Sequence, residues 1–174
     1  GYSNKSNPNS KDGFYVVKEG KIIKSAIKQI FMGSYEANKN ENNLLADYLG
    51  KLEKERLFKV DGKNIRLIIC GENNMLRNEQ TKNNRVSFRS NEHMLKSRFH
   101  SIVENTDIFL NSAHTPMGNL GKLKKRWAYL SKSSRSCLFT TNECADKNSK
   151  SNPRTNIPNL HKRSLQYIFM NGKE

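Results

Sequence analysis

Short apolar blocks separated by polar turns run along the whole chain and predict its elements. Apolar residues at 14–17 and 21–23 flank a Glu-Gly pair, which predicts a β-hairpin. Residues 57–60 and 65–69 flank an Asp-Gly pair and predict a second hairpin, whose last strand meets Cys70. Further short apolar blocks at 107–110, 136–140 and 165–169 predict three more strands.

Three stretches between these blocks place apolar residues three and four positions apart, which is typical of one buried helix face. The three sets are Leu45, Tyr48, Leu49 and Leu52, in a helix reaching about residue 56; Leu95, Phe99, Ile102 and Val103; and Leu120, Leu123, Trp127 and Leu130. We expect Ser90 to act as the N-cap of the second helix. The basic run Lys122, Lys124, Lys125 and Arg126 is expected on the solvated face of the third, and could also contact phosphate.

The order strand, helix, strand, helix, strand predicts parallel crossovers, so we expect an α/β fold with a mixed sheet. The domain organisation that follows is a flexible leader or surface loop over 1–12, an α/β core over 13–145 and a polar extension over 146–174 that ends in a strand. With 174 residues, the chain suits one domain or a fragment of a larger one.

Polar residues follow three of the predicted strands, at 70–74, 111–115 and 141–143. Reactive groups in α/β sheets lie just past the carboxyl ends of the strands, so these segments are expected to line a site. Cys70 ends an apolar strand and precedes Gly71, whose backbone N–H can approach a ligand closely. Cys70 is therefore either a nucleophile beside an oxyanion-binding amide or a small core residue.

The net charge adds a second hypothesis. The chain has 31 Lys and Arg against 16 Asp and Glu, a formal charge of +15, but the basic residues are scattered. This charge is either background composition or a surface for a polyanion. No apolar run approaches the ~20 residues of a membrane helix and no secretory leader is visible, so we expect a cytoplasmic protein without a membrane partner. The spacing of Cys70, Cys137 and Cys144 predicts reduced thiols.

Several segments resemble the nitrilase (carbon–nitrogen hydrolase) superfamily. Residues 58–72, FKVDGKNIRLIICGE, resemble its nucleophile segment, and residues 20–31, GKIIKSAIKQIF, resemble the segment that carries its catalytic lysine, here Lys28. Glu36 matches the spacing of an accessory glutamate. Residues 107–111 resemble the strand beside the pocket, and 125–142 resemble the following helix, strand and terminal Asn, so the resemblance spans about residues 14–142.

The resemblance implies a truncated αββα sandwich that hydrolyses a non-peptide carbon–nitrogen bond, such as an amide or nitrile-like bond, through a cysteine thioester. It implies Cys70 as nucleophile, Lys28 as the cation beside the thiolate and the oxyanion, and Glu36 as an accessory acid. It implies no metal or organic cofactor, and pairing of subunits through the helices that cover the sheet.

The substrate pocket is expected to include Gly71, Glu72, Asn111 and His114. Glu72 either binds polar substrate groups or caps a turn, and His114 either lines the pocket or makes ordinary loop hydrogen bonds. His93 and His100 lie two helical turns apart without a pair of carboxylates nearby, so no metal site is expected.

The general base of the family is a glutamate well upstream of its lysine, and neither Asp12 nor Glu19 matches it. We therefore expect either part of a longer or split hydrolase, completed by another segment or a partner chain, or a scaffold that has lost its base. An alternative function is a noncatalytic basic α/β module that binds nucleic acid or another polyanion. A third is a noncatalytic subunit that completes the site of a partner.

Overall fold

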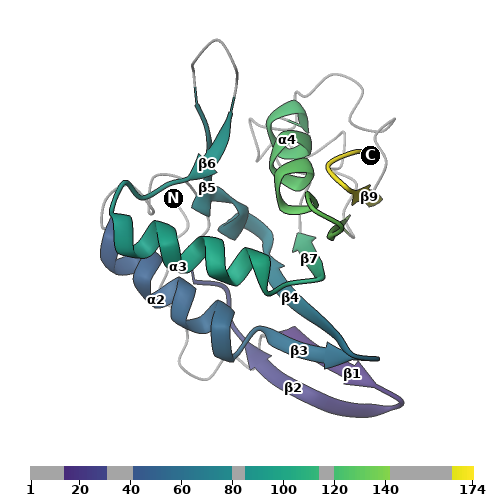
Figure 1. The fold of residues 1–174 in the computed structure, drawn as a ribbon. Helices are drawn as coiled ribbons and strands as arrows, with labels where there is room; N and C mark the ends of the chain where they lie inside the picture. Colours follow the sequence, from purple (N-terminus) through teal and green to yellow (C-terminus); the bar gives the residue numbers. More distant parts are fainter. Residues whose placement is uncertain (1–13, 31–40, 80–84, 114–119, 142–165) are drawn as a thin grey trace, which may run out of the picture.

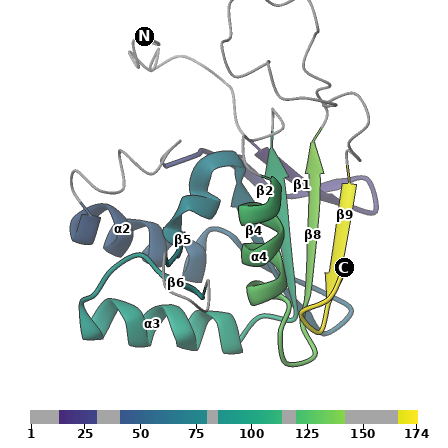
Figure 2. The same ribbon diagram turned by 90° about the horizontal axis from the view of Figure 1, so that it is seen from above.

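The computed structural model describes residues 14–30, 41–79, 85–113, 120–141 and 166–174 (Figure 1). Its centre is a five-stranded mixed sheet with the strand order β3-β4-β7-β8-β9. The helices lie on one side of this sheet and a separate two-stranded hairpin lies on the other, as Figure 2 shows. The predicted α/β class is confirmed.

The elements follow the apolar blocks of the sequence. The central sheet consists of β3 (Leu57–Val60), β4 (Lys63–Ile69), β7 (Ile108–Ala113), β8 (Ser136–Thr141) and β9 (Gln166–Met170). The helices are α2 (Glu41–Lys54), α3 (His93–Glu104), α4 (Leu120–Leu130) and the 3-10 helix η1 (Cys70–Met75). Two small hairpins complete the fold, β1 (Phe14–Lys18) with β2 (Lys21–Ile27) and β5 (Leu76–Asn78) with β6 (Val86–Phe88). None of the helices in the described ranges could cross a membrane.

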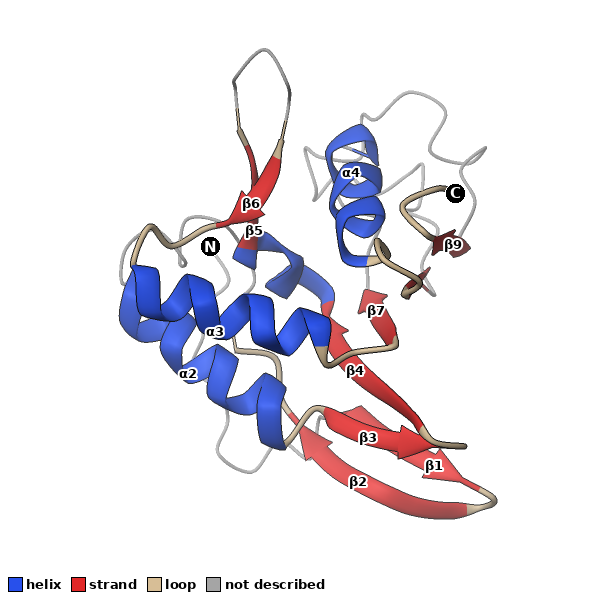
Figure 3. Ribbon diagram, viewed as in Figure 1, coloured by secondary structure: helices blue, strands red, loops and turns tan. Residues whose placement is uncertain are grey.

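Strands β4, β7 and β8 run parallel, and β3 and β9 pair antiparallel at the two edges. Figure 3 shows β3 and β4 pointing in opposite directions, and Figure 2 shows the same for β8 and β9. The predicted parallel crossovers are therefore present, with α3 between β4 and β7 and α4 between β7 and β8. Both predicted hairpin turns occur. Glu19 and Gly20 have φ of 50° and 75°, and Asp61 and Gly62 have φ of 48° and 77°, the left-handed pairs that tight two-residue turns require.

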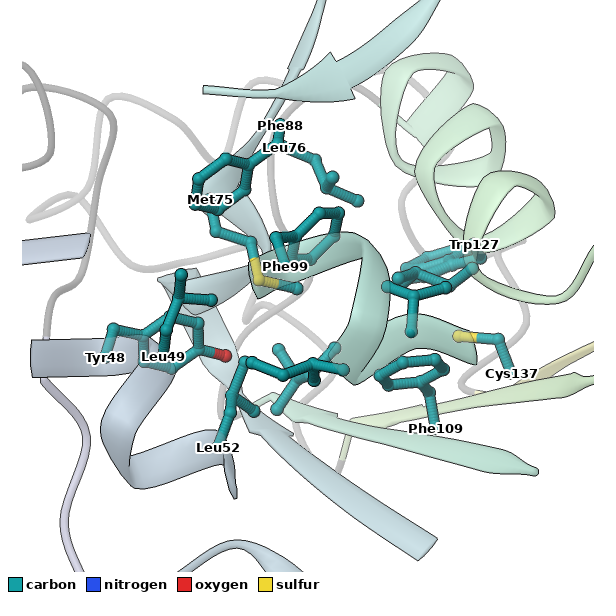
Figure 4. Close-up of a cluster of buried hydrophobic side chains, with 14 of the residues drawn as sticks. Tyr48, Leu49, Leu52, Met75, Leu76, Phe88, Phe99, Phe109, Trp127 and Cys137 are labelled. Carbon is teal, nitrogen blue, oxygen red and sulfur yellow. The ribbon is translucent and has the colours of Figure 1, made fainter. Parts of the chain in front are cut away.

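The main core lies between the helices and the sheet (Figure 4). The apolar stripes that predicted α2, α3 and α4 are buried in it, except that Leu120 is half-buried. Trp127 of α4 stacks on Phe139 of β8, with ring centroids 4.3 Å apart, and so joins the last helix to the sheet.

The opposite face of the sheet is covered unevenly. The β1–β2 hairpin packs over β3 and β4, where Ile27 joins Phe58 and Leu67 in a second apolar cluster. Farther across, Leu110, Leu138 and Ile168 lie in one cross-strand row, and the Ile168 residue is 57% exposed. This face is therefore apolar beyond the area that the hairpin covers.

Three local features differ from the sequence prediction. The short β5–β6 hairpin was not predicted, because three-residue strands of mixed polarity leave no clear period. The predicted N-cap was wrong: α3 is preceded by Glu92, and the Ser90 hydroxyl instead accepts from the Glu92 amide and contacts Asn42 of α2. Arg126, expected on a solvated face, is buried.

Helices α2 and α3 are joined at their surface by Glu53 and Arg98, whose two hydrogen bonds measure 2.9 and 2.6 Å. The Arg98 guanidinium lowers the pKa of Glu53. A carboxyl whose pKa is lower in the folded protein stabilises the fold above its unfolded-state pKa, and this contribution disappears as pH falls through the folded-state pKa.

We predict that Glu53→Gln lowers the free energy of unfolding by less than about 1 kcal/mol at neutral pH, because the pair is partly solvated. The difference from the unmodified protein should vanish in acid. Urea unfolding across this pH range measures it, with Arg98→Gln and the double variant as controls. Losses that simply add in the double variant would show that the two side chains act independently.

Candidate active site

Cys70 occupies an unusual backbone position at the end of β4. It is a half-buried free thiol at the first position of η1, and its φ of 44° lies in the left-handed region. This region costs energy for a residue with a Cβ, and such residues concentrate at functional sites. Because β4 runs parallel to β7 and β8, Cys70 also lies at the carboxyl edge of the sheet, where α/β proteins place reactive groups.

Arg56 and Glu72, the latter two positions after Cys70, form a fully buried ion pair. The Glu72 carboxylate accepts hydrogen bonds from both terminal nitrogens of Arg56, with Nη2 at 2.7 Å. It also accepts from the backbone amides of Ile30 and Ile69, each at 2.8 Å. Arg56 Nη2 donates a further bond of 2.6 Å to the Lys28 carbonyl.

These hydrogen bonds join two segments that are distant in sequence. Arg56 holds the backbone at Lys28, and Glu72 holds the backbone at Ile30 and at Ile69, next to Cys70. The end of β2 is therefore fixed beside the turn that carries the thiol. The Lys28 side chain is exposed, and its backbone is part of this arrangement.

Tyr48 of α2 completes the buried cluster. The Arg56 guanidinium carbon lies 5.4 Å from the centre of the Tyr48 ring. Burial, together with the nearby Glu72 charge, raises the pKa of Tyr48 well above its usual range. Burial also raises the pKa of Glu72, against the opposing effects of Arg56 and the two amides. Desolvation is thus the dominant electrostatic influence on the Glu72 carboxyl.

Hydrogen bonds of the Asn73 and Asn111 side-chain amides connect η1 to β7 and α4. The Asn111 side chain on β7 accepts hydrogen bonds at 2.9 Å from Asn73 Nδ2 and from the Trp127 indole, and donates to the Ile68 carbonyl at 3.3 Å. Asn111 is fully buried. Its amide thereby connects η1, α4 and the sheet.

Arg126 of α4 anchors the segment that follows Cys70. Its guanidinium donates bonds of 2.9 Å to the side-chain oxygens of Asn74 and Asn78 and a longer bond to the Asn73 carbonyl. Burial, with a smaller effect of Arg89, lowers the pKa of Arg126 to about 10, so it remains a cation at neutral pH. The turn after the thiol is thus held from both sides.

The fold brings several of the predicted site residues together. Cys70, Gly71, Glu72 and the backbone of Lys28 lie in one region. Glu72 and Asn111 are buried and make internal hydrogen bonds, and Gly71 is buried. Glu36 and His114 lie outside the described residues.

Sequence reasoning missed Arg56 and Arg126 as supporting residues. Arg56 follows Leu52 by four positions and Leu49 by seven, the spacing of the buried stripe, and this was the available signal that it points inward. Arg126 lies three positions after Leu123 and four before Leu130, so its spacing carried the same signal.

No group of three or more His, Cys, Asp or Glu side chains suited to a metal ion occurs in the described ranges. Comparison of the chain with family models, curated proteins and solved structures found no match. A function for this chain therefore has to be inferred from the geometry around Cys70.

We predict strong energetic coupling between Arg56 and Glu72. Arg56→Met or Glu72→Met alone should lower the free energy of unfolding by about 3–5 kcal/mol, because each leaves a buried charge without its partner. The double variant Arg56→Met with Glu72→Met should lose clearly less than the sum of the single losses. Urea unfolding of the four proteins measures this coupling, and strictly additive losses would contradict it.

Proposed function

We propose that the chain is a nitrilase-like hydrolase, or the remnant of one, that acts on a non-peptide carbon–nitrogen bond such as an amide. The observation that supports this most directly is the left-handed backbone of Cys70 at the carboxyl edge of parallel strands. A strained residue is retained where the surrounding structure holds it, and here the ion pair and Arg126 both brace its turn.

Lys28 is proposed as the cation of the site. Its backbone carbonyl is bound by Arg56, which also binds Glu72 of the Cys70 turn, and its side chain is exposed. An ammonium group there would favour the thiolate and stabilise the negative oxygen of a tetrahedral intermediate. Glu36 remains proposed as the accessory acid.

In the proposed reaction, Cys70 Sγ forms a bond to the amide carbon, and the carbonyl electrons move onto the oxygen. When the carbonyl re-forms, the carbon–nitrogen bond breaks and the nitrogen leaves with an added proton, which produces a thioester. Water then attacks the thioester carbon, releasing the carboxylic acid and the thiol. Both steps need a group that accepts and returns a proton.

The proposed reaction also needs a proton acceptor near Cys70. Glu72 is the acid closest in sequence to Cys70, and its two oxygens already accept four hydrogen bonds. We propose that the base is a glutamate supplied by another segment or a partner chain, or that Glu36 takes this role in place of its accessory one. Substrate contacts by Gly71 and His114 remain part of this proposal.

The uneven second face of the sheet supports the sandwich architecture proposed with this function. The β1–β2 hairpin already forms a second β layer over β3 and β4. Ile168 and Met170 continue an apolar surface beyond it, at 57% and 59% exposure. We propose that further strands cover this surface in the complete αββα assembly, whether from another segment, a partner chain or a second copy.

We predict that Cys70 is the reactive thiol and that Lys28 activates it. In a Cys144→Ser background, iodoacetamide should label Cys70 and spare Cys137, because burial raises the pKa of the Cys137 thiol and shields it. Lys28→Ala should slow labelling about tenfold, the effect of losing one nearby stabilising cation. Intact-mass spectrometry over time measures the rate, and simple amides test for an acyl adduct of the same residue.

Lys21→Ala provides the matched control, since Lys21 is an exposed lysine at the start of β2, the strand that ends just before Lys28, and the variant has the same net charge. It should label at the unmodified rate. Labelling that is absent from Cys70, or equally fast in the Lys28 and Lys21 variants, would rule out the catalytic assignment.

A further inference from the structure

A cavity of about 660 Å³ opens between the β5–β6 hairpin, α3 and α4. Figure 1 shows the hairpin standing between the two helices. The volume of the cavity lies within the range of small-molecule binding sites. None of its lining residues belongs to the Cys70 site, so the cavity requires its own explanation.

Basic side chains line this cavity from all three elements. Arg85 lies just before β6, Lys96 and His100 lie on α3, Lys125 lies on α4 and Lys132 lies just beyond the end of α4. Lys96 and His100 are four positions apart on α3, so they lie on one face of that helix.

These cations are not neutralised within the described part of the chain. Glu79 is the only acidic residue lining the cavity, and none of the ion pairs found among the described residues includes a cation of the cavity. Elsewhere on the surface, lysines and arginines do find carboxylates, as in the Arg98–Glu53 and Lys63–Asp107 pairs. A cavity with this charge attracts an anion.

An aromatic surface lies beside the positive charges. Tyr129 is half-buried in the cavity wall, with Phe88, Val86 and Ala128 as apolar neighbours. The Lys132 ammonium lies 5.9 Å from the centre of the Tyr129 ring. A planar ring that stacks on an aromatic side chain while its charged groups meet lysines is the combination used to bind single-stranded nucleic acids.

We propose that this cavity binds a nucleotide, either free or within a single strand, with its phosphates on Lys96, Lys125 and Arg85 and its base against Tyr129. The proposal is independent of the hydrolase function. A second copy of the chain is a poorer occupant, because symmetrical pairing through this surface would bring the same uncompensated cations together.

Fluorescence anisotropy of a fluorescein-labelled single-stranded oligonucleotide, titrated with the full chain at several salt concentrations, tests the proposal. Binding should weaken steeply with salt. Unlabelled ATP should compete, and its affinity relative to the oligonucleotide distinguishes a free nucleotide from a strand as the preferred ligand. Competition by inorganic polyphosphate but not by ATP would overturn the role of the base, and absence of binding at low salt would overturn the proposal.

Matched charge variants locate the site. Lys96→Glu with Lys125→Glu should weaken binding at least about tenfold and reduce the slope of log K against log salt by about 0.7 for each phosphate that the protein no longer neutralises. Lys21→Glu with Lys59→Glu makes the same change in net charge at exposed positions on β2 and β3, and should retain binding. Equal weakening in both proteins would show that net charge alone drives binding.

Two further variants test the ring contact and the independence of the two sites. Tyr129→Leu should weaken oligonucleotide binding about tenfold because the base no longer stacks on an aromatic ring, with circular dichroism confirming that the variant is folded. Unchanged affinity in a folded Tyr129→Leu protein would contradict the stacking contact. Cys70→Ala should bind as the unmodified protein does, and loss of binding in that variant would tie the cavity to the Cys70 site and overturn its independence.

Discussion

The buried ion pair between Arg56 and Glu72 is the interaction on which the arrangement of the Cys70 region depends. It lies where the end of α2, the end of β2 and the carboxyl end of β4 meet. Without it, the amides of Ile30 and Ile69 and the carbonyl of Lys28 would lack charged hydrogen-bond partners inside the protein. Three separate parts of the chain are thus positioned by one pair of side chains.

Burying such a pair costs free energy, because the charges lose their hydration, so the pair adds little net stability. Its effect is to fix the positions of the segments that it joins. Glu72 has hydrogen-bond partners on each oxygen, and the pair binds the segment after β2 to the Cys70 turn. The Asn111 and Arg126 networks add the same kind of constraint from the opposite side, so the strained cysteine lies in a rigid frame.

The two faces of the central sheet differ in character. The helical face is packed around Trp127 and bears the cationic cavity at its outer edge. The opposite face is apolar and is only partly covered by the β1–β2 hairpin. Within the described part of the chain, the cavity lysines lack ion-pair partners and apolar residues on the other face of the sheet are exposed, and ligands or partners commonly cover such features.

The sequence by itself determined the longer strands and helices, though not η1 or the β5–β6 hairpin, and the position of Cys70 at the end of a strand. Helix stripes such as Leu45 to Leu52 and turns such as Asp61-Gly62 depend on residues close in sequence, so their periods and conformational preferences are visible without a structure. The tertiary structure alone decided which polar side chains are buried. Arg56 meets Glu72 across 16 positions and Asn111 meets Asn73 across 38, and no local pattern encodes such pairings. A buried charge is stable only when distant segments deliver its partners, so its role appears only once the chain is folded.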